Sequence, residues 1–551
     1  MLTTATRPTP SSSPVFRPSL AQRGLALLLF AFLWSPGLVV ALGSGGLDAR
    51  ERLAVLGLSF WLLAMGPALL GSLRMSFLVW TPLALLLPPY VYLCLSFGST
   101  PGDALVAAAM HTSPAQSVQV LSGFGAWLLA WAVLAVAYPL AAWRLDARWR
   151  WATGRRKLWL ALLLGAASLS LLLKQAVPQQ LSLPAFFERD TFDQVFPLNL
   201  LSSVQRVMAQ DRRAPRTTSL NGRPRPGSVD EPLHLVLVVG ETVRPDHLGI
   251  YGYARDTTPG LSAIRDELLL FRDVASTAHW TDGAVPGIVG RTIDARHQGG
   301  LVRTMREAGY LTGWLSNQEI SDLFRDAHVA DFSDGMYELL LRMDTALLPP
   351  FDALLRQGGP RQFIALHMTG SHFPYERQYD AQSRKFTPTL TDAGVSGNPG
   401  PRFKAETINS YDNTLVALDR FLMRVIDRLR ADPEPALLVY TSDHGENLFD
   451  DDRQRFMHAL ADPSKADTTV PLFFWANDAY RSRWPDAFAA LSLHAKAPVS
   501  HTDLMPTLLD LASVDADGIA PHESLRSPDW RPHPRRLQQI DGPGWDYDKI
   551  R

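Results

Sequence analysis

The stretch LHLVLVVGETVRPDH (233–247) joins a short apolar run to a cluster of polar residues. Its first seven residues are almost all leucine and valine, which is typical of a strand buried on both faces. Helical patterns at 300–309 and 405–430 separate similar runs. Those runs are LTGWLS (311–316), FIALHM (363–368), ALLVYTS (436–442) and VPLFFWA (470–476). This alternation predicts an α/β domain with a mostly parallel sheet and helices on both faces.

Polar side chains follow several of these predicted strands at the point where each strand ends. Glu241 follows the first, His372 lies shortly after the third, and Asp443 and His444 follow the fourth. In open α/β sheets the ligand site lies beyond the carboxyl ends of the strands. Each residue alone could cap a helix or line a solvated loop, but together they favour an oxygen and imidazole site for zinc or manganese.

The composition excludes several other kinds of site. Cys94 is the single cysteine and lies in an apolar run, so an intrachain disulfide and a thiolate metal cluster are both excluded. The formal net charge is −1, which gives no indication of a nucleic-acid partner. A site built from carboxylate, hydroxyl and imidazole groups therefore remains.

The N-terminal third is predicted to be a transmembrane domain over residues 1–174. It contains five apolar runs, each close to the ~20 residues that cross a bilayer. These runs are 24–43, 53–72, 76–98, 124–143 and 158–173. The first is too long for a signal-peptide core and is followed by four more, so we interpret it as a membrane span.

Loop charges predict the orientation of these five spans. The loop at 144–157 carries six Lys and Arg residues, whereas 99–123 carries none. The positive-inside rule then places the N-terminus in the cytoplasm and everything after about residue 175 outside it. The short turn at 44–52, with Arg50 and Arg52, is discordant. Residues 175–232 are predicted to be an amphipathic segment followed by an Arg- and Pro-rich linker, which leaves 233–551 as the catalytic domain.

Four sequence blocks resemble the phosphoethanolamine transferases, which are membrane enzymes of the alkaline phosphatase/sulfatase superfamily that modify lipopolysaccharide. The blocks are VVGETVRPDHLGIYGYARDTTP (238–259), LHMTGSHFP (366–374), YDNT (411–414) and YTSDHGE (440–446). The resemblance covers about 233–515 and includes the five-span plan. It implies an inner-membrane protein whose catalytic domain is periplasmic.

The resemblance also implies the site residues. It places a catalytic Zn2+, with a second ion left open and Mn2+ less favoured, on Glu241, Thr281, Asp443 and His444. Within TAHWTDGAVP (277–286) the nucleophile is identified by its spacing to the Val-Pro pair, which selects Thr281 over Thr277 and leaves His279 and Asp282 without a role. His372 and His458 are expected at the substrate phosphate or at a second metal, and Asn317 is expected to contact substrate.

The implied reaction moves phosphoethanolamine from phosphatidylethanolamine to a periplasmic glycolipid, either lipid A or a lipopolysaccharide core sugar. A metal-bound threonine hydroxyl loses its proton more readily, and a phospho-threonine intermediate splits the transfer into two displacements. His372 and His458 could stabilise phosphoryl charge, protonate the leaving alkoxide or hold a second metal; the sequence leaves these roles open.

Two alternatives compete with this interpretation. One is a phosphoglycerol transferase of the same superfamily, and the other is a catalytically inactive, membrane-anchored glycan-binding protein. A sulfatase activity is disfavoured because 276–291 lacks the C/S-x-P-x-R motif. The absence of disulfides and the pair His279–Trp280 depart from the family pattern and leave the acceptor in doubt. The tail at 522–551 has no strand pattern and receives no functional prediction.

Overall fold

The computed structural model describes most of the chain. It covers residues 18–43, 49–97, 100–101, 106, 110, 125–150, 153–176, 192–211, 219–290, 300–318, 326–332, 343–395, 398–460, 462–539 and 544–550. The chain divides into two compact units. One comprises Met1–Leu95 and Gly125–Asn199, and the other comprises Ser96–Phe124 and Leu200–Arg551.

The first unit is helical, and helices cover all five of the apolar runs. They are α1 (Leu20–Gly43), α2 (Ala49–Leu70), α3 (Leu73–Val79), α4 (Thr81–Phe97), α7 (Gly125–Trp143) and α8 (Thr153–Ala176). Among the described residues, α1 and α2 are long and apolar enough to cross a membrane, and α3 with α4, bent by 56°, can form a third span. The unit is therefore a helical membrane region with two or three spans by length and composition.

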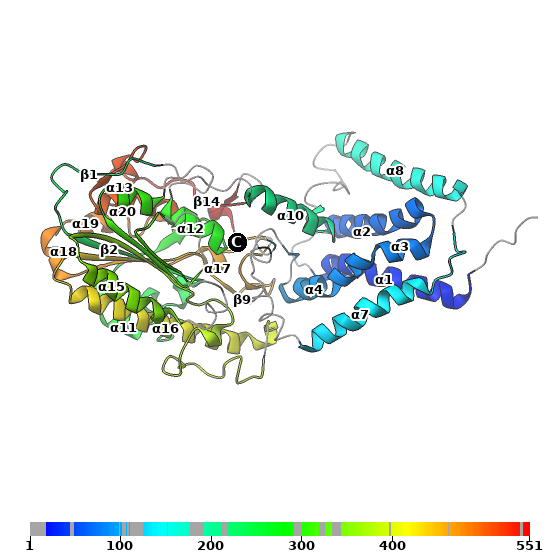
Figure 1. Cartoon of the computed structure of the whole chain (residues 1–551), viewed down its shortest axis with the longest axis horizontal. Helices are drawn as coiled ribbons and strands as arrows, with labels where there is room; N and C mark the ends of the chain where they lie inside the picture. The colour runs from blue at the N-terminus through cyan, green and yellow to red at the C-terminus, as the bar shows by residue number, and fades with distance from the viewer. Residues whose placement is uncertain are drawn as a thin grey trace, which may run out of the picture. The chain divides into compact units, whose positions relative to one another are not determined.

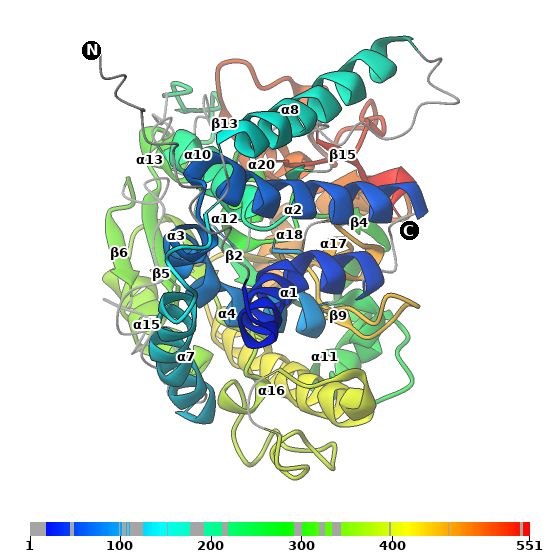
Figure 2. The ribbon, with the colours of Figure 1, turned by 90° about the vertical axis from the view of Figure 1, so that its right-hand side faces the viewer.

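Packing within this unit leaves much apolar surface uncovered. Helix α1 contacts α2 and α7, and α8 lies along α2 in both views (Figures 1 and 2). Leu29, Leu33 and Leu87 are buried between helices, whereas Leu28 and Leu129 are exposed. Exposed leucines are unfavourable in water but favourable in contact with lipid chains. Their presence on helices of this length therefore suits a membrane environment.

The predicted amphipathic segment includes a helix in the part that the structure describes. Helix α10 (Leu198–Asp211) buries Val207 against Val106, whereas Leu201 is exposed. One face of α10 is thus packed and the other leaves apolar side chains uncovered. Residues 193–197, before α10, form turns and a bend, and residues 177–191 lie outside the described part of the chain.

The second unit is built on a seven-stranded sheet with the order β3-β11-β8-β2-β7-β5-β6. The strands are β2 (Leu233–Gly240), β3 (Leu269–Phe271), β5 (Leu311–Ser316), β6 (Val329–Phe332), β7 (Arg361–His367), β8 (Ala436–Ser442) and β11 (Leu472–Ala476). Strand β11 is antiparallel to both of its neighbours, and the other neighbouring pairs are parallel. The predicted mostly parallel sheet is confirmed, and the antiparallel strand β11 makes it mixed.

All five strands predicted from the sequence are present, and the sheet gains two that were missed. Strands β3 and β6 have only three and four residues, too few to show a clear pattern. Between β8 and β11 the described residues form the hairpin β9 (Asn447–Leu448) and β10 (Phe456–Met457) and the four-residue helix α17 (Lys465–Thr468), and β11 pairs antiparallel with β8.

Helices cover both faces of the sheet, as predicted (Figure 1). One face carries α12 (Thr281–Val289), α13 (Leu301–Glu307) and α20 (Leu504–Leu511), and the other carries α11 (Pro259–Ala263), α15 (Leu348–Gln357) and α16 (Lys404–Arg430). Alternate residues of β2 enter the two resulting cores: Leu235 and Leu237 on one side, Val236 and Val238 on the other. This double burial explains the unbroken apolar run in the sequence.

The C-terminal tail contains two short strands, although its sequence showed no strand pattern. Strands β14 (Arg536–Leu537) and β15 (Trp545–Asp546) pair antiparallel. A 3-10 turn over Tyr547–Lys549 follows β15. Two-residue strands are too short for the alternation that identifies a strand in a sequence.

Candidate active site

Adjacent parallel strands bring three of the predicted ligands together. Glu241 follows β2, while Asp443 and His444 follow β8, and the register pairs Gly240 with Ser442. Nε2 of His444 lies 3.5 Å from Oε1 of Glu241 and 3.3 Å from Oδ2 of Asp443. All three side chains are fully buried. The carboxyl edge of the sheet therefore carries the polar cluster that its topology predicts.

The first residue of α12 brings a hydroxyl to this cluster. Oγ1 of Thr281 donates to Oε2 of Glu241 at 3.2 Å and lies 3.4 Å from Nε2 of His444. Thr277 lies elsewhere: it is fully buried and donates to the carbonyl of Ala284 at 3.2 Å. Of the two hydroxyls that the sequence offered, the structure brings that of Thr281 to the carboxylates.

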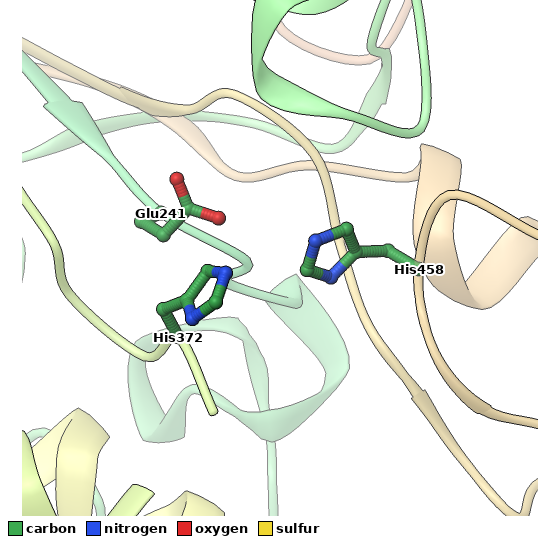
Figure 3. Close-up of side chains that lie close together, drawn as sticks. All are labelled: Glu241, His372 and His458. Atoms are coloured by element: carbon green, nitrogen blue, oxygen red, sulfur yellow. The ribbon is translucent and has the colours of Figure 1, made fainter. Parts of the chain in front are cut away.

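Two further histidines face the same space. Figure 3 shows the imidazoles of His372 and His458 pointing toward the carboxylate of Glu241. One potential ligand atom from each of the three lies within 4.8 Å of the others. The His372 and His458 ring centroids are 5.6 Å apart, and that of His458 is 4.2 Å from the His444 ring. Both histidines thus border the Glu241–Asp443–His444 cluster, and their expected place at a substrate phosphate or a second metal stays a prediction.

The Nδ1 contacts of these histidines leave their Nε2 atoms toward the site. Nδ1 of His444 lies 2.9 Å from the carbonyl of Gly445, and Nδ1 of His372 lies 2.6 Å from that of Phe373. A carbonyl only accepts, so Nδ1 carries the hydrogen in both rings and Nε2 keeps its lone pair. Nδ1 of His458 lies 3.1 Å from Oε1 of Glu446, and a hydrogen bond joins these two atoms.

Burial controls the charge of the site. Burial, reinforced by the charge of Asp443, raises the pKa of Glu241. Burial alone would raise the pKa of Asp443 as well, but neighbouring His444 reverses this and the pKa is lowered. Burial lowers the pKa of both His372 and His458 to about 4. Both imidazoles are therefore neutral at pH 7, unlike the protonated form the sequence left open.

The carboxylate pair fits a divalent cation. Oε1 of Glu241 and Oδ2 of Asp443 are buried and have no hydrogen-bond partner within the described part of the chain. Leaving such oxygens unpaired is costly, and a bound cation would satisfy both. With Nε2 of His444 and Oγ1 of Thr281, they form an oxygen and nitrogen donor set of the kind that zinc accepts. The Glu241–Asp443–His444 cluster could therefore hold a metal ion.

Sequence reasoning missed one residue that contacts this cluster. Nε2 of Gln318 donates to Oε2 of Glu241 and to the carbonyl of Met368, each at 2.6 Å. The preceding residue, Asn317, was expected to meet substrate; it is fully buried and donates to Oδ1 of Asp344 at 3.0 Å. Gln318 follows the end of β5 closely, so the strand-end argument could have identified it.

The surrounding polar residues support the site. Asp412 accepts hydrogen bonds from His247, Tyr253 and Arg255 and is fully buried. Such a network stabilises the loop after β2.

Asp450 forms an ion pair and a backbone hydrogen bond near the site. Asp450 pairs with buried Arg244 at 2.8 Å and accepts from the backbone N–H of Leu448 at 2.8 Å. Arg244 also donates to the carbonyl of Glu446 at 3.1 Å. These bonds join the loop after β2 to the β9–β10 hairpin, which ends beside His458.

Comparison with known proteins places the fold in a family. The sulfatase family profile matches residues 234–514, which is more than half of the chain. The chain belongs to the sulfatase family. Within it, the chain belongs with the membrane-anchored phosphoethanolamine transferases, which confirms the resemblance found in the four sequence blocks.

The curated relatives bear this out. Phosphoethanolamine transferase EptC of Escherichia coli K12 is 27% identical over 353 residues, covering 60% of this chain and 59% of the relative. Phosphatidylethanolamine transferase Mcr-1 of Escherichia coli is 28% identical over 387 residues, covering 64% and 69%. The matched part of the chain thus spans about 59% of the length of EptC.

Solved structures share the fold. The integral membrane lipooligosaccharide phosphoethanolamine transferase EptA of Neisseria meningitidis superposes with a TM-score of 0.73 at 24% identity, over 92% of this chain and 98% of that one. The periplasmic domain of Escherichia coli EptC in complex with Zn gives a TM-score of 0.53 at 25% identity, over 61% and 98%. A relative with the same catalytic fold has therefore been crystallised with zinc.

Proposed function

We propose that this protein is a zinc-dependent phosphoethanolamine transferase that uses Thr281 as its nucleophile. The observation that carries the proposal is the position of one hydroxyl. Oγ1 of Thr281 lies 3.2 Å from a carboxylate oxygen of Glu241 and 3.4 Å from Nε2 of His444, beside two unpartnered buried oxygens. Relatives named phosphoethanolamine transferase and phosphatidylethanolamine transferase support the substrate class.

Glu241, Asp443 and His444 would hold the zinc ion together with Oγ1 of Thr281. When bound there, zinc supplies a Lewis acid that makes the threonine hydroxyl more acidic and offsets negative charge on the phosphoryl oxygens. Gln318 keeps Oε2 of Glu241 in place through its 2.6 Å hydrogen bond. The lone pair on Nε2 of His444 is fixed by the Nδ1 contact to Gly445.

The first displacement forms a bond between Oγ1 of Thr281 and the phosphorus of phosphatidylethanolamine and breaks the bond to the diacylglycerol oxygen. The threonine proton passes to a neutral imidazole, Nε2 of His372 or His458, and from there to the departing alkoxide. The N-terminus of α12, where Thr281 lies, favours the negative charge of the phosphoryl group. The products are diacylglycerol and phosphoethanolamine on Thr281.

The second displacement transfers the phosphoethanolamine. A hydroxyl or phosphate oxygen of the acceptor attacks the phosphorus, and Oγ1 of Thr281 leaves. When the acceptor is a hydroxyl, its proton passes to the same imidazole and from there to Oγ1 of Thr281. The acceptor is a periplasmic glycolipid, either a lipid A phosphate or a core sugar of lipopolysaccharide.

The membrane unit suits substrates that live in the bilayer. We propose five spans over residues 1–174, an amphipathic and linker segment over 175–232, and a periplasmic catalytic domain over 233–551, with the N-terminus cytoplasmic. A tethered catalytic domain meets a lipid donor and a lipid-anchored acceptor at high local concentration. The helical N-terminal unit, with two or three spans by length and composition among the described residues, and its exposed leucines support the membrane location of this unit.

Mass spectrometry of host lipids tests the reaction. Lipopolysaccharide from cells that express the active protein should carry an added phosphoethanolamine, and cells that express Thr281→Ala should lack it. The same extracts should show diacylglycerol released from phosphatidylethanolamine. Consumption of phosphatidylglycerol instead would favour the phosphoglycerol transferase. Modification by the alanine variant would refute the mechanism, and purified protein that cannot bind zinc would favour the inactive glycan-binding alternative.

A further inference from the structure

The C-terminal tail contacts the segment that leads to Thr281. This tail lies beyond the residues matched by the sulfatase profile, which ends at 514. The backbone N–H of Gln538 donates to the carbonyl of Thr277 at 2.6 Å. Leu537 and Tyr547 pack with Ala275 in one buried cluster. Residues at the ends of the two tail strands thus contact Ala275 and Thr277.

Tyr547 joins this segment to its neighbour in the fold. Its hydroxyl lies 2.8 Å from Oγ1 of Thr469, and its carbonyl accepts from Nζ of Lys465 at 2.7 Å. The same Nζ lies 3.3 Å from the centroid of the tyrosine ring, a cation–π contact. Thr469 in turn pairs with Ala275 as a β-bridge. Tyr547 therefore holds both partners of the bridge that precedes Thr281.

Arg535 secures the tail on its other side. Its guanidinium pairs with Asp273 and Asp548, and it lies 4.4 Å from the centroid of the Tyr547 ring. The side chain of Arg535 is only 5% exposed, whereas those of Asp273 and Asp548 are 43% and 53% exposed. Asp273 begins β4 (Asp273–Ala275), the strand that leads to the Thr277 segment.

Thr277 passes this restraint to the helix that begins at Thr281. Its hydroxyl donates to the carbonyl of Ala284 in α12. A Cβ added at Gly287, one turn further along α12, would lie 2.0 Å from the same Oγ1. The helix is therefore packed so closely against Thr277 that displacement of one requires displacement of the other.

We propose that the tail hairpin, through Tyr547 and Gln538, is a positioning strap that sets the location of Thr281. The strap does not touch the reacting atoms; it fixes Ala275–Thr277, and Thr277 fixes α12. An attacking oxygen must be held close to its in-line position, because small misplacements slow a displacement strongly. The inference rests on the proposed role of Thr281 as nucleophile.

The test compares tail variants of the full-length, zinc-loaded protein. Tyr547→Ala removes the ring that packs on Ala275, whereas Tyr547→Phe keeps it and loses only the bond to Thr469. Arg536→Ala is the matched control, since Arg536 is exposed on the same hairpin. In single turnover with phosphatidylethanolamine, Tyr547→Ala should form phospho-Thr281 at least about tenfold more slowly, with donor KM changed less than about twofold. Tyr547→Phe should stay within about threefold of the parent rate.

Hydrogen–deuterium exchange tests the strap without relying on activity. Backbone amides within 273–285 should exchange faster in Tyr547→Ala than in the parent protein. In Arg536→Ala they should exchange at the parent rate. Gln538→Pro removes the N–H that bonds to Thr277 and should also speed exchange within 273–285. It replaces Tyr547→Ala in the test if that variant does not fold. A parent protein without phosphoryl transfer would refute the proposed function and leave this readout intact. Exchange at the parent rate in both Tyr547→Ala and Gln538→Pro would refute the proposed strap. A loss of transfer rate that is explained by lower zinc content would refute it as well.

Discussion

Thr277 and Thr281 lie four residues apart in the same segment, yet only the hydroxyl of Thr281 reaches Glu241. Thr277 directs its hydroxyl to the carbonyl of Ala284, 3.2 Å away, and is fully buried. Thr281 directs its hydroxyl to Oε2 of Glu241, also at 3.2 Å. The two threonines therefore have separable roles, one in packing and one at the site.

Matched substitutions should separate these roles. Thr281→Val should abolish phosphoryl transfer, by at least about a thousandfold, because it removes the attacking oxygen. Its unfolding midpoint should stay near that of the parent. Thr277→Val should lower the free energy of unfolding by about 1 kcal/mol through the lost hydrogen bond. It should slow transfer far less than Thr281→Val does, because the valine side chain has nearly the shape of threonine and still packs against α12. Transfer assays and thermal unfolding check both; substantial transfer by Thr281→Val would contradict the assignment.

Gly287 provides a test of the packing between Thr277 and α12. Gly287→Ala places a methyl group 2.0 Å from Oγ1 of Thr277, so one of the two must move. We expect a cost of about 1–3 kcal/mol and slower transfer, because α12 carries Thr281. Gly400→Ala is the control, since nothing lies within 4 Å of its added Cβ. Thermal unfolding and the transfer assay report the outcome, and equal behaviour of the two variants would argue against tight packing here.

Strand ends could be predicted from this sequence, but the contacts between them could not. The apolar runs of the buried strands predicted the fold, and the positions directly after β2 and β8 predicted Glu241, Asp443 and His444 as site residues. Periodicity does not encode which side chains bridge elements distant in sequence. Gln318 bonds to Glu241 across 77 residues, and Gln538 bonds to Thr277 across 261, so both were missed. The tail hairpin was missed for a second reason, because its strands have two residues each.

Gln318 should strengthen metal binding without touching the metal. Gln318→Leu removes the donor to Oε2 of Glu241 and leaves the carboxylate free to turn. Loss of such an orienting hydrogen bond typically weakens metal affinity by about 10–100-fold. Competition with a zinc chelator measures the affinity, and Gln382→Leu, at an exposed position, serves as the control. Unchanged affinity in Gln318→Leu would show that the carboxylate is held by other contacts.

The proposed topology predicts which loops face the cytoplasm. In a Cys94→Ser background, a cysteine at Arg148 in the arginine-rich loop should react with a membrane-impermeant thiol reagent only after the membrane is opened. A cysteine at Ser117, in the segment without Lys or Arg, should react in intact spheroplasts. Both must remain active to count. The reverse labelling pattern would invert the orientation and place the catalytic domain in the cytoplasm.

The carboxylate pair predicts a pH dependence that zinc should reverse. Burial, with the charge of Asp443, raises the pKa of Glu241 above its usual 4.5 in the metal-free fold. A group with a raised folded-state pKa binds its proton more tightly when folded. Its stabilising contribution is therefore complete below pH 4.5 and is lost as pH rises toward the raised pKa. Glu241→Gln carries no such proton and should not show this loss.

Thermal unfolding in chelator should then fall more steeply with pH above about 5 for the parent than for Glu241→Gln. As pH rises above about 5 the metal-free parent should lose stability relative to the variant, because folding must then either take up a proton at Glu241 or bury its charge. Added zinc should raise the parent midpoint and leave the variant unchanged, since zinc needs the ionised carboxylate. Asp486→Asn, an exposed carboxylate elsewhere in the domain, should follow the parent in both conditions. If the unfolding midpoints of the parent and Glu241→Gln changed with pH in the same way, the pKa of Glu241 would not be raised by its burial beside Asp443.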